Sequence, residues 1–315
     1  MPELITIRKP ITQVHNSLNE RSSLASTGCD SGFGHSLAER LSKKGFLVFA
    51  GCLNSNSDGA EELSRLNNIV VLQMDVTKQE QVDEAFVAVK EKLGARVLWS
   101  VVANAGIGSC GLLEWTTMET ITKMFDVNVF GVLRVIKMFL PLLRRSQGRV
   151  VAIASPLGRL AVPMVAPYCM TKIAVISMMD SLRRECHGRG VDFVTVEPAA
   201  YRQVQTPITW MFASSKEHVL RELRKQTPEV IADYSEQDID DWLKVTDTFS
   251  GPMIRKDPEE CVDVIEKAVR ETHPLTHYHS PWGVDFLYLS ALLSLPIDVA
   301  DALVEVIRKV HLKLL

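Results

Sequence analysis

The alternation of short apolar runs with longer helix-like segments constrains this chain more than any other feature. The apolar runs are Phe46–Leu53, Ile69–Val76, Val97–Gly106, Gly148–Ser155 and Val191–Pro198. The helix-length segments are Gly34–Lys44, Gln79–Leu93, Thr117–Arg145 and Pro167–His187. Continuous β-branched runs, rather than strict alternation of apolar and polar residues, indicate strands that are covered on both faces. Strands separated by helices predict right-handed crossovers and an α/β fold with a doubly wound, Rossmann-type parallel sheet.

The length of the chain suits one large domain. It has 315 residues, and no internal repeat or low-complexity linker marks a boundary. We therefore predict a disordered N-terminal extension at residues 1–21, followed by a single domain at residues 22–315.

The pattern changes after Pro198. Residues 200–260 are helical and polar, and further helices follow, with a short strand at Leu275–His279. In a doubly wound fold, material added after the late strands lies over their carboxyl ends, where ligands bind. We therefore predict that residues 200–315 form a helical cap over a substrate pocket.

Charge and cysteine usage exclude several classes of partner. Net charge is −3, from 35 basic and 38 acidic residues, so no basic excess indicates a nucleic-acid partner. The six cysteines are scattered singly and form no CxxC pair. That spacing indicates neither a disulfide framework nor a zinc site, and a reducing compartment is the simpler interpretation.

No run of about 18–20 apolar residues predicts a membrane-spanning helix. The N-terminus also lacks the apolar core that a signal peptide needs. The nearest approach to a span is Phe286–Ile297, which ends at a proline. It fits a buried helix, or a helix that also touches a membrane surface. The second interpretation predicts peripheral membrane contact through residues 283–312.

A glycine-rich stretch, STGCDSGFGHSLAERL at Ser26–Leu41, stands directly before a helix pattern. Glycine adopts positive φ and lets another backbone or a phosphate approach closely. The helix that follows presents free N–H groups and a positive dipole end, so the pair forms a cradle for a pyrophosphate. The run before the loop, ERSSLAS, is mostly polar, whereas a buried apolar strand normally stands there. We therefore expect a poorly formed first strand and a weakly anchored loop.

Further motifs follow this loop in a characteristic order. Thr27–Gly34 has the form TGxxxGxG, and an NAG motif follows at Asn104–Gly106. Asn128, Ser155 and the YxxxK pair of Tyr168–Lys172 complete the series. As a set, these motifs resemble those of the short-chain dehydrogenase/reductase family over roughly residues 24–310. The variant GCDSGFG is similar to the branch that contains 3-hydroxybutyrate dehydrogenase, 17-beta-hydroxysteroid dehydrogenase type 2 and the retinol dehydrogenases.

The resemblance implies a nicotinamide dinucleotide cofactor. The positions that it assigns to cofactor binding are Gly28, Asp30, Ser31, Gly32, Phe33, Gly34, Asn54, Asp75, Asn104, Ala105, Gly106, Tyr168, Lys172 and Pro198. Asp75 resembles the aspartate that meets the adenine edge, but it also fits a plain turn at the end of a strand.

The residues favour NAD over NADP. NADP needs a cation for its 2′-phosphate, yet the loop carries Asp30 and Ser31, and no basic residue follows in Gly51–Asn54. An acidic loop repels the extra phosphate. Because no acidic residue ends that strand, Asn54 or the backbone has to hold the ribose hydroxyls.

The candidate catalytic residues are Asn128, Ser155, Tyr168 and Lys172. Hydride transfer from an alcohol needs a base for the hydroxyl proton, and a free tyrosine has a pKa of about 10. Tyr168 and Lys172 share a helix face at i and i+4, so the lysine cation can lower that pKa and hold the nicotinamide ribose. Ser155 can hydrogen-bond the substrate oxygen, and Asn128 can hold a water that links Lys172 to solvent.

Other polar residues near these motifs have two interpretations. Arg159 and Arg202 could bind a substrate carboxylate, or they could form structural ion pairs. His277 and His279 share a face of a short strand but lack an evident third ligand, so no metal is expected. The family usually has Pro-Gly after the sixth strand, whereas this chain has Pro198–Ala199. Alanine does not adopt positive φ cheaply, so we expect a shifted backbone there, and Gln203 replaces a frequent threonine.

The sequence therefore predicts an NAD-dependent oxidoreductase that interconverts a secondary or lipid alcohol of hydroxysteroid or retinoid type with its carbonyl. (R)-3-Hydroxybutyrate is the alternative substrate, and a catalytically impaired dinucleotide-binding homologue is the second alternative. Family analogy predicts a homodimer or homotetramer paired through helices 117–145 and 167–187. A membrane-associated location in the mitochondrion or endoplasmic reticulum is expected, or a cytoplasmic one if the N-terminus is complete as given.

Overall fold

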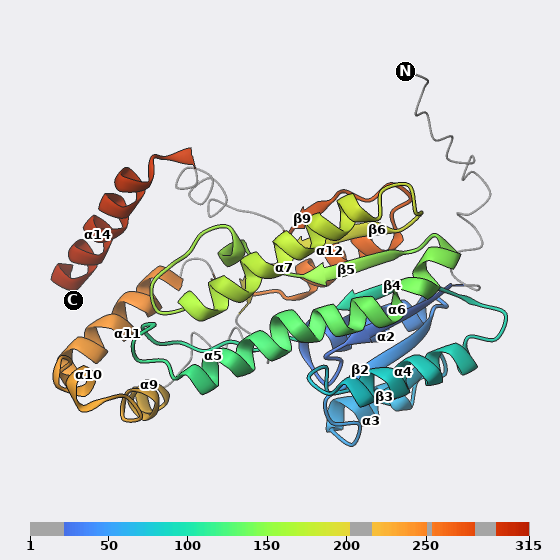
Figure 1. Cartoon of the computed structure of the whole chain (residues 1–315), viewed down its shortest axis with the longest axis horizontal. Helices are drawn as coiled ribbons and strands as arrows, with labels where there is room; N and C mark the ends of the chain where they lie inside the picture. Colours follow the sequence, from blue (N-terminus) through green and yellow to red (C-terminus); the bar gives the residue numbers. More distant parts are fainter. Residues whose placement is uncertain (1–21, 202–215, 251–253, 281–293, 315) are drawn as a thin grey trace.

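A parallel seven-stranded sheet forms the centre of the fold (Figure 1), and its strand order is β3-β2-β1-β4-β5-β6-β9. The computed structural model describes residues 22–201, 216–250, 254–280 and 294–314. The strands are β1 Ser22–Thr27, β2 Leu47–Cys52, β3 Ile69–Gln73, β4 Val97–Ala103, β5 Arg149–Ile153, β6 Asp192–Glu197 and β9 His277–His279. The order reverses between β1 and β4, which makes the carboxyl ends of these strands the expected ligand site. The doubly wound prediction is confirmed.

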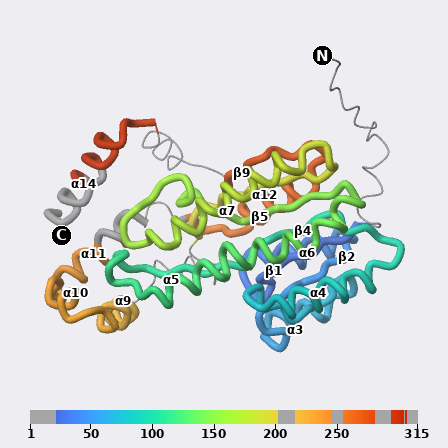
Figure 2. Tube along the Cα trace, viewed as in Figure 1, coloured from blue at the N-terminus to red at the C-terminus, as the bar shows by residue number. Residues whose placement is uncertain are grey.

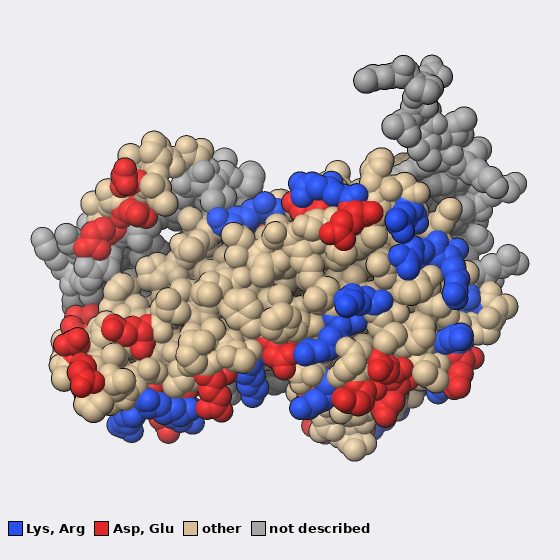
Figure 3. Space-filling view, in the orientation of Figure 1, with Lys and Arg blue, Asp and Glu red and all other residues tan. Residues whose placement is uncertain are grey.

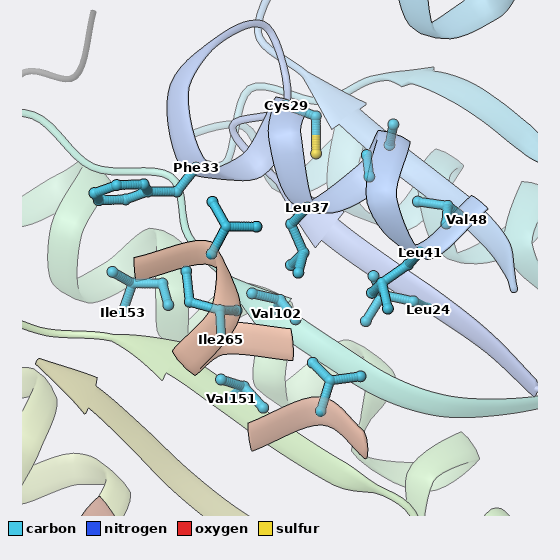
Figure 4. Close-up of a cluster of buried hydrophobic side chains, with 14 of the residues drawn as sticks. Leu24, Cys29, Phe33, Leu37, Leu41, Val48, Val102, Val151, Ile153 and Ile265 are labelled. Carbon is cyan, nitrogen blue, oxygen red and sulfur yellow. The ribbon is translucent and has the colours of Figure 1, made fainter. Parts of the chain in front are cut away.

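Two layers of helices cover the sheet, because neighbouring residues of each strand point to opposite faces. The helices are α2 Gly32–Lys43, α3 Asp58–Ser64, α4 Gln79–Lys92, α6 Val132–Ser146, α7 Ala166–Glu185 and α12 Glu259–Arg270. Leu24 and Val102 face the cluster built with α2, α3 and α12, and Figure 4 shows them packed against Leu37, Leu41 and Ile265. Ala25 and Val101 face the cluster built with α4, α6 and α7. Helix α3 was not expected from the sequence.

Strand β1 corrects the expectation of a poorly formed first strand. All of its residues are buried, and it pairs with β2 on one side and β4 on the other. A central strand is held by hydrogen bonds from both neighbours, and these do not depend on its side chains. Leu24 and Ala25 supply the apolar contact to the two faces, and Ser23 Oγ donates to the Val97 carbonyl at 2.9 Å. The small polar side chains therefore fit a strand that the sequence pattern alone did not indicate.

The predicted long helix at 117–145 is divided. Helix α5, Met118–Phe125, leads into a π-helical segment, η1, at Asp126–Gly131, and α6 follows. Gly131 lies against the turn after β3, where an added Cβ would be 2.6 Å from Val76 Cγ2. Insertions of this kind are frequent at functional sites, and this one carries Asn128.

The described residues after β6 are mainly helical. Strands β7 Ala200–Tyr201 and β8 Ile254–Arg255 pair in parallel, and helices α9 Lys216–Leu223, α10 Pro228–Ala232 and α11 Glu236–Ser250 lie beyond the end of α5 (Figures 1 and 2). Arg202, Gln203 and residues 283–293 lie outside the described residues. Helix α14, Ile297–Leu314, exposes Ile297, Val299 and Val306. In the described part of the chain, no helix is long and apolar enough to cross a membrane. The substrate cap and the membrane contact stay predictions.

Candidate active site

The glycine loop lies at the carboxyl end of β1 and is closed by direct backbone contact. Gly28 has φ of +67°, and a Cβ there would lie 2.9 Å from Ala105 Cα. A Cβ on Gly34 would clash with the Gly28 carbonyl oxygen and lie 2.6 Å from Asn104 Nδ2. Helix α2 begins at Gly32, so its first N–H groups point out of this loop. The geometry fits a cradle for a phosphate group.

Asn104 fastens the loop to β4. Its Nδ2 donates to the carbonyls of Thr27 and Gly28 at 2.9 and 3.1 Å. In return, Thr27 Oγ1 accepts the backbone N–H groups of Asn104 and Ala105 at 3.0 and 2.9 Å. The Asn104 side chain is thus committed to the shape of the loop. Thr27 opens the TGxxxGxG motif, but the sequence assigned it no role, because its hydrogen-bond partners lie in a distant segment.

Asp30 reaches across to the end of β2. Its carboxylate accepts the backbone N–H groups of Leu53 and Asn54 at 2.8 and 2.9 Å, and the Ser57 hydroxyl lies 3.5 Å away. Gly59 presses against the Asp30 carbonyl, where a side chain would not fit. These contacts hold one negative charge at the turn after β2.

Two other predicted cofactor residues have structural contacts. Asp75 Oδ1 accepts from the Thr77 backbone N–H and hydroxyl at 2.9 and 2.7 Å, which closes the turn after β3. Phe33 is buried and packs edge-to-face on Tyr201, with ring centroids 5.6 Å apart. The adenine contact of Asp75 stays a prediction beside the turn that the sequence also allowed.

Tyr168 and Lys172 lie on one buried face of α7. Lys172 Nζ donates to the Ile153 carbonyl at 2.9 Å and lies 5.4 Å from the centroid of the Tyr168 ring. Only 2% of Tyr168 is exposed, and its hydroxyl has no hydrogen-bond partner among the described residues. A buried hydroxyl without a partner is costly, so this atom marks a place where a ligand oxygen fits.

Burial acts on both titrating groups. It raises the pKa of Tyr168 above its usual range, and the neighbouring Ser155 hydroxyl acts in the opposite direction. Burial lowers the pKa of Lys172 to about 8. Burial disfavours the charged form of each group alone. A tyrosinate beside an ammonium is favoured, because the attraction between the two charges offsets the cost of desolvating them.

Ser155 lies beside Tyr168 but comes from a different element. It follows β5 and caps the short 3₁₀ helix η2, Pro156–Gly158, where its Oγ accepts the Leu157 N–H at 3.2 Å. The cap leaves the hydroxyl proton available to a second acceptor. Ser155 is 4% exposed, so its orientation is set by the protein rather than by solvent.

Asn128 holds the loop after β4 against α7. Its Oδ1 accepts the Ile107 N–H at 2.8 Å. Its Nδ2 donates to the Ile107 carbonyl at 2.8 Å and to Thr171 Oγ1 at 3.0 Å. Gly106 lies beside it, where a Cβ would be 3.7 Å from Lys172 Nζ. The side chain therefore positions residues around Lys172, and its role in holding a water stays a prediction.

The remaining predicted residues are placed as follows. Arg159 binds the buried Glu197, so the structural ion pair is the interpretation that the structure shows. Ala199 does not adopt positive φ, and its N–H donates to Ser280 Oγ at 2.9 Å. Among the described residues, no cluster of three or more His, Cys, Asp or Glu side chains could hold a metal ion. Pro198 follows β6 at the same edge of the sheet.

Comparison with known proteins agrees with this geometry. A family model described as short chain dehydrogenase matches residues 24–217. The mitochondrial D-beta-hydroxybutyrate dehydrogenase of Rattus norvegicus is 36% identical over 285 residues, which cover 87% of this chain and 81% of that protein. Retinol dehydrogenase 7 of the same species is 37% identical over 285 residues, covering 88% and 86%. Human 17-beta-hydroxysteroid dehydrogenase type 6 is 36% identical over 279 residues, covering 87% and 85%.

Solved structures give the same fold. A short-chain dehydrogenase from Streptomyces avermitilis superposes with a TM-score of 0.68 at 21% identity, covering 92% of this chain and 97% of that one. The chain belongs to the short-chain dehydrogenase family. It is an oxidoreductase that acts on CH–OH groups, as the resemblance in its motifs predicted.

Proposed function

We propose that this chain is an NAD-dependent dehydrogenase that interconverts an apolar secondary or lipid alcohol and its carbonyl. One observation carries the proposal: Tyr168 belongs to a cluster of buried, mainly apolar side chains, and its buried hydroxyl has no hydrogen-bond partner among the described residues. Gly28, Gly34 and the start of α2 suit a dinucleotide pyrophosphate, and the Tyr168 hydroxyl suits an alcohol oxygen.

The residues divide the chemistry between them. When bound, the nicotinamide supplies the hydride acceptor. Lys172 stabilises the Tyr168 tyrosinate, which burial alone disfavours, and this tyrosinate takes the hydroxyl proton of the alcohol and becomes the neutral phenol. Ser155 donates a hydrogen bond to the same substrate oxygen. In the reverse direction, Tyr168 returns the proton to the carbonyl oxygen.

The apolar cluster around Tyr168 indicates the substrate class. It joins α9 to the loop after β4 and to α7, and its buried members include Trp115, Met164, Val219 and Leu223. A substrate carboxylate would need a cation in this cluster. Arg159 is committed to Glu197, and Arg202 lies outside the described residues. The apolar character of this cluster favours a hydroxysteroid or retinoid over (R)-3-hydroxybutyrate, which is the second candidate because of the rat relative's name.

A panel of alcohols tests the proposal. NADH formation is measured with hydroxysteroids, retinol and (R)-3-hydroxybutyrate at equal NAD. Turnover of an apolar alcohol that exceeds turnover of 3-hydroxybutyrate supports the proposal. The reverse order supports the second candidate, and NAD binding without turnover of any alcohol supports an impaired homologue.

Asp30 is expected to set the choice of NAD over NADP. The ribose of a dinucleotide is read at the end of the second strand, where a 2′-phosphate needs a cation or free N–H donors. Asp30 places a negative charge there and occupies the N–H groups of Leu53 and Asn54. We expect Asp30→Ala to lower the preference for NAD, as the ratio of kcat/KM values, by about tenfold.

The control for this variant is Asp58→Ala. Asp58 is an exposed carboxylate at the start of α3, in the same region of the surface. The Asp58→Ala variant should leave the ratio of kcat/KM values for NAD and NADP unchanged. An equal change in both variants would show that only general surface charge matters, and no change in the Asp30 variant would contradict the assignment.

We also propose that the chain forms a homodimer or homotetramer through α5, η1 and α7. Figure 3 shows that the face over these helices is largely free of charged side chains. Apolar side chains stand exposed there, among them Phe130 at 49%, Met170 at 44% and Ile173 at 56%. Exposed apolar patches of this kind mark contacts between proteins.

A buried carboxylate at this face should dissociate the assembly. Ile173→Glu is expected to reduce the mass in solution, measured by light scattering, to that of the 35.2 kDa monomer. Val87→Glu changes an equally exposed residue of α4 and should leave the mass unaltered. A monomeric native protein would contradict the proposal.

A further inference from the structure

Glu197 is a fully buried carboxylate that the proposed chemistry does not use. It ends β6, directly before Pro198, and its exposed fraction is 0%. A buried carboxylate has to be paired and hydrogen-bonded, because the free-energy cost of removing its charge from water is otherwise not offset. The partners of Glu197 therefore reveal what the fold holds in place.

Arg159 supplies the main partner. Its Nε donates to Glu197 Oε2 at 2.7 Å, and its Nη2 donates to Oε1 at 2.5 Å, which makes a two-point fork. Such a fork fixes direction as well as distance, because the guanidinium and the carboxylate have to be coplanar. His277 and His279 of β9 complete the surroundings, with their Nδ1 atoms 3.5 and 3.4 Å from the same carboxylate.

The fork lies at the end of the turn that begins with Ser155. The turn is short and internally bonded: the Gly158 N–H donates to the Ser155 carbonyl at 2.9 Å, and the Arg159 N–H donates to the Pro156 carbonyl at 2.8 Å. Its middle presses on α7, where a Cβ on Gly158 would be 2.8 Å from the carbonyl carbon of Lys172. The turn is thus held by β5 at one end and by Arg159 at the other.

The backbone at Glu197 is also fastened to the end of β9, through Ser280. The Ser280 N–H donates to the Glu197 carbonyl at 3.3 Å, and Ser280 Oγ accepts the Ala199 N–H at 2.9 Å. The end of β9 therefore fastens the turn after β6 at two points. This connection stands where the family's Pro-Gly is replaced by Pro198–Ala199.

We propose that Arg159 and Glu197 are positioning residues, whose ion pair holds the Ser155 turn in the orientation that places the Ser155 hydroxyl beside Tyr168. The inference rests on the proposed dehydrogenase function. It assigns Arg159 a role through Ser155 rather than through contact with substrate.

Loss of the fork should act on kcat. Small displacements of a reacting group cost up to about 10²-fold in rate. Arg159→Gln is expected to lower kcat by about 10-fold to 100-fold while the KM for NAD stays within about twofold. The Ser155 hydroxyl lowers the pKa of Tyr168, so its displacement raises that pKa. The rise of alcohol oxidation with pH should therefore move to higher pH.

Several variants separate positioning from general stability. Arg159→Gln leaves the buried Glu197 without its guanidinium partner, so the double variant Arg159→Gln with Glu197→Gln removes that charge and should restore the thermal midpoint but not kcat. Arg159→Lys keeps the charge without the fork, and a partial recovery of kcat is expected. Arg40→Gln breaks a surface pairing with Glu259 and Asp263, remote from Ser155, and should leave kcat and the pH profile unchanged.

Hydrogen exchange gives a readout that does not depend on turnover. The peptide that spans residues 153–160 should exchange faster in Arg159→Gln than in the native chain and the Arg40 variant. Faster exchange with no turnover in any protein would reject the dehydrogenase function and keep the positioning role. An unchanged kcat and pH profile in folded Arg159→Gln would overturn the proposal. A raised KM for the alcohol at constant kcat would also overturn it, in favour of substrate binding.

Discussion

The Tyr168→Phe chain is expected to bind NAD as the native chain does and to lose about 10³-fold in kcat, within the usual range for loss of a general base. The change removes one oxygen and leaves the ring in its apolar cluster. That oxygen has no partner among the described residues, so the fold gives up no hydrogen bond. The free energy of unfolding should stay the same or increase, because a buried unpaired hydroxyl is lost.

Three measurements on this variant distinguish chemistry from folding. Steady-state turnover gives kcat, titration of protein fluorescence with NAD gives affinity, and thermal unfolding gives stability. Tyr201→Phe is the matched control, since Tyr201 is equally buried and its hydroxyl likewise lacks a partner within the described ranges. It should keep the native kcat. A Tyr168→Phe chain that retains more than about a tenth of native kcat would show that another group takes the proton.

The Gly34→Ala chain is expected to lose about 10-fold to 100-fold in NAD affinity. A Cβ at this position meets the Gly28 carbonyl oxygen and Asn104 Nδ2, which are held by bonds to each other. Neither group can move without opening the loop between β1 and α2. Overpacking of this kind costs about 1–3 kcal/mol, and every 1.4 kcal/mol of binding energy corresponds to about tenfold in affinity.

Calorimetric titration with NAD measures this loss, and Gly188→Ala controls for strain. Gly188 has φ of +76° and open space around the position of a Cβ. Alanine there should lower stability through its backbone conformation and leave NAD affinity unchanged. Equal affinity in the Gly34 variant and the native chain would mean that the glycine loop does not hold the cofactor.

The sheet was predictable because its signals are local. Runs such as Ile69–Val76 carry enough β-branched residues to indicate buried strands without knowledge of their neighbours. Strand β1 was not predictable in this way, because its stability comes from pairing with β2 and β4 rather than from its own serine side chains. The π-helical segment at Asp126–Gly131 was not predicted either, and its last residue, Gly131, lies against Val76 in a distant part of the sequence.

In the candidate site too, contacts between residues close in the sequence were predictable, and contacts between distant segments were not. Tyr168 and Lys172 are close in sequence, so helical spacing placed them on one face. The contacts of Asp30 with Leu53 and Asn54, and of Arg159 with Glu197, join distant segments. Only the folded sheet brings those partners together. The sequence left Arg159 open between a substrate contact and an ion pair, and no local pattern could separate the two.

Transfer of deuterium tests the central claim most directly. The native chain is incubated with NAD and an apolar secondary alcohol that carries deuterium on its carbinol carbon, and the reduced cofactor is analysed by mass spectrometry. Direct hydride transfer predicts that each NADH carries one deuterium and that Tyr168→Phe forms almost none. Unlabelled NADH, or labelled NADH formed equally by Tyr168→Phe, would contradict the account.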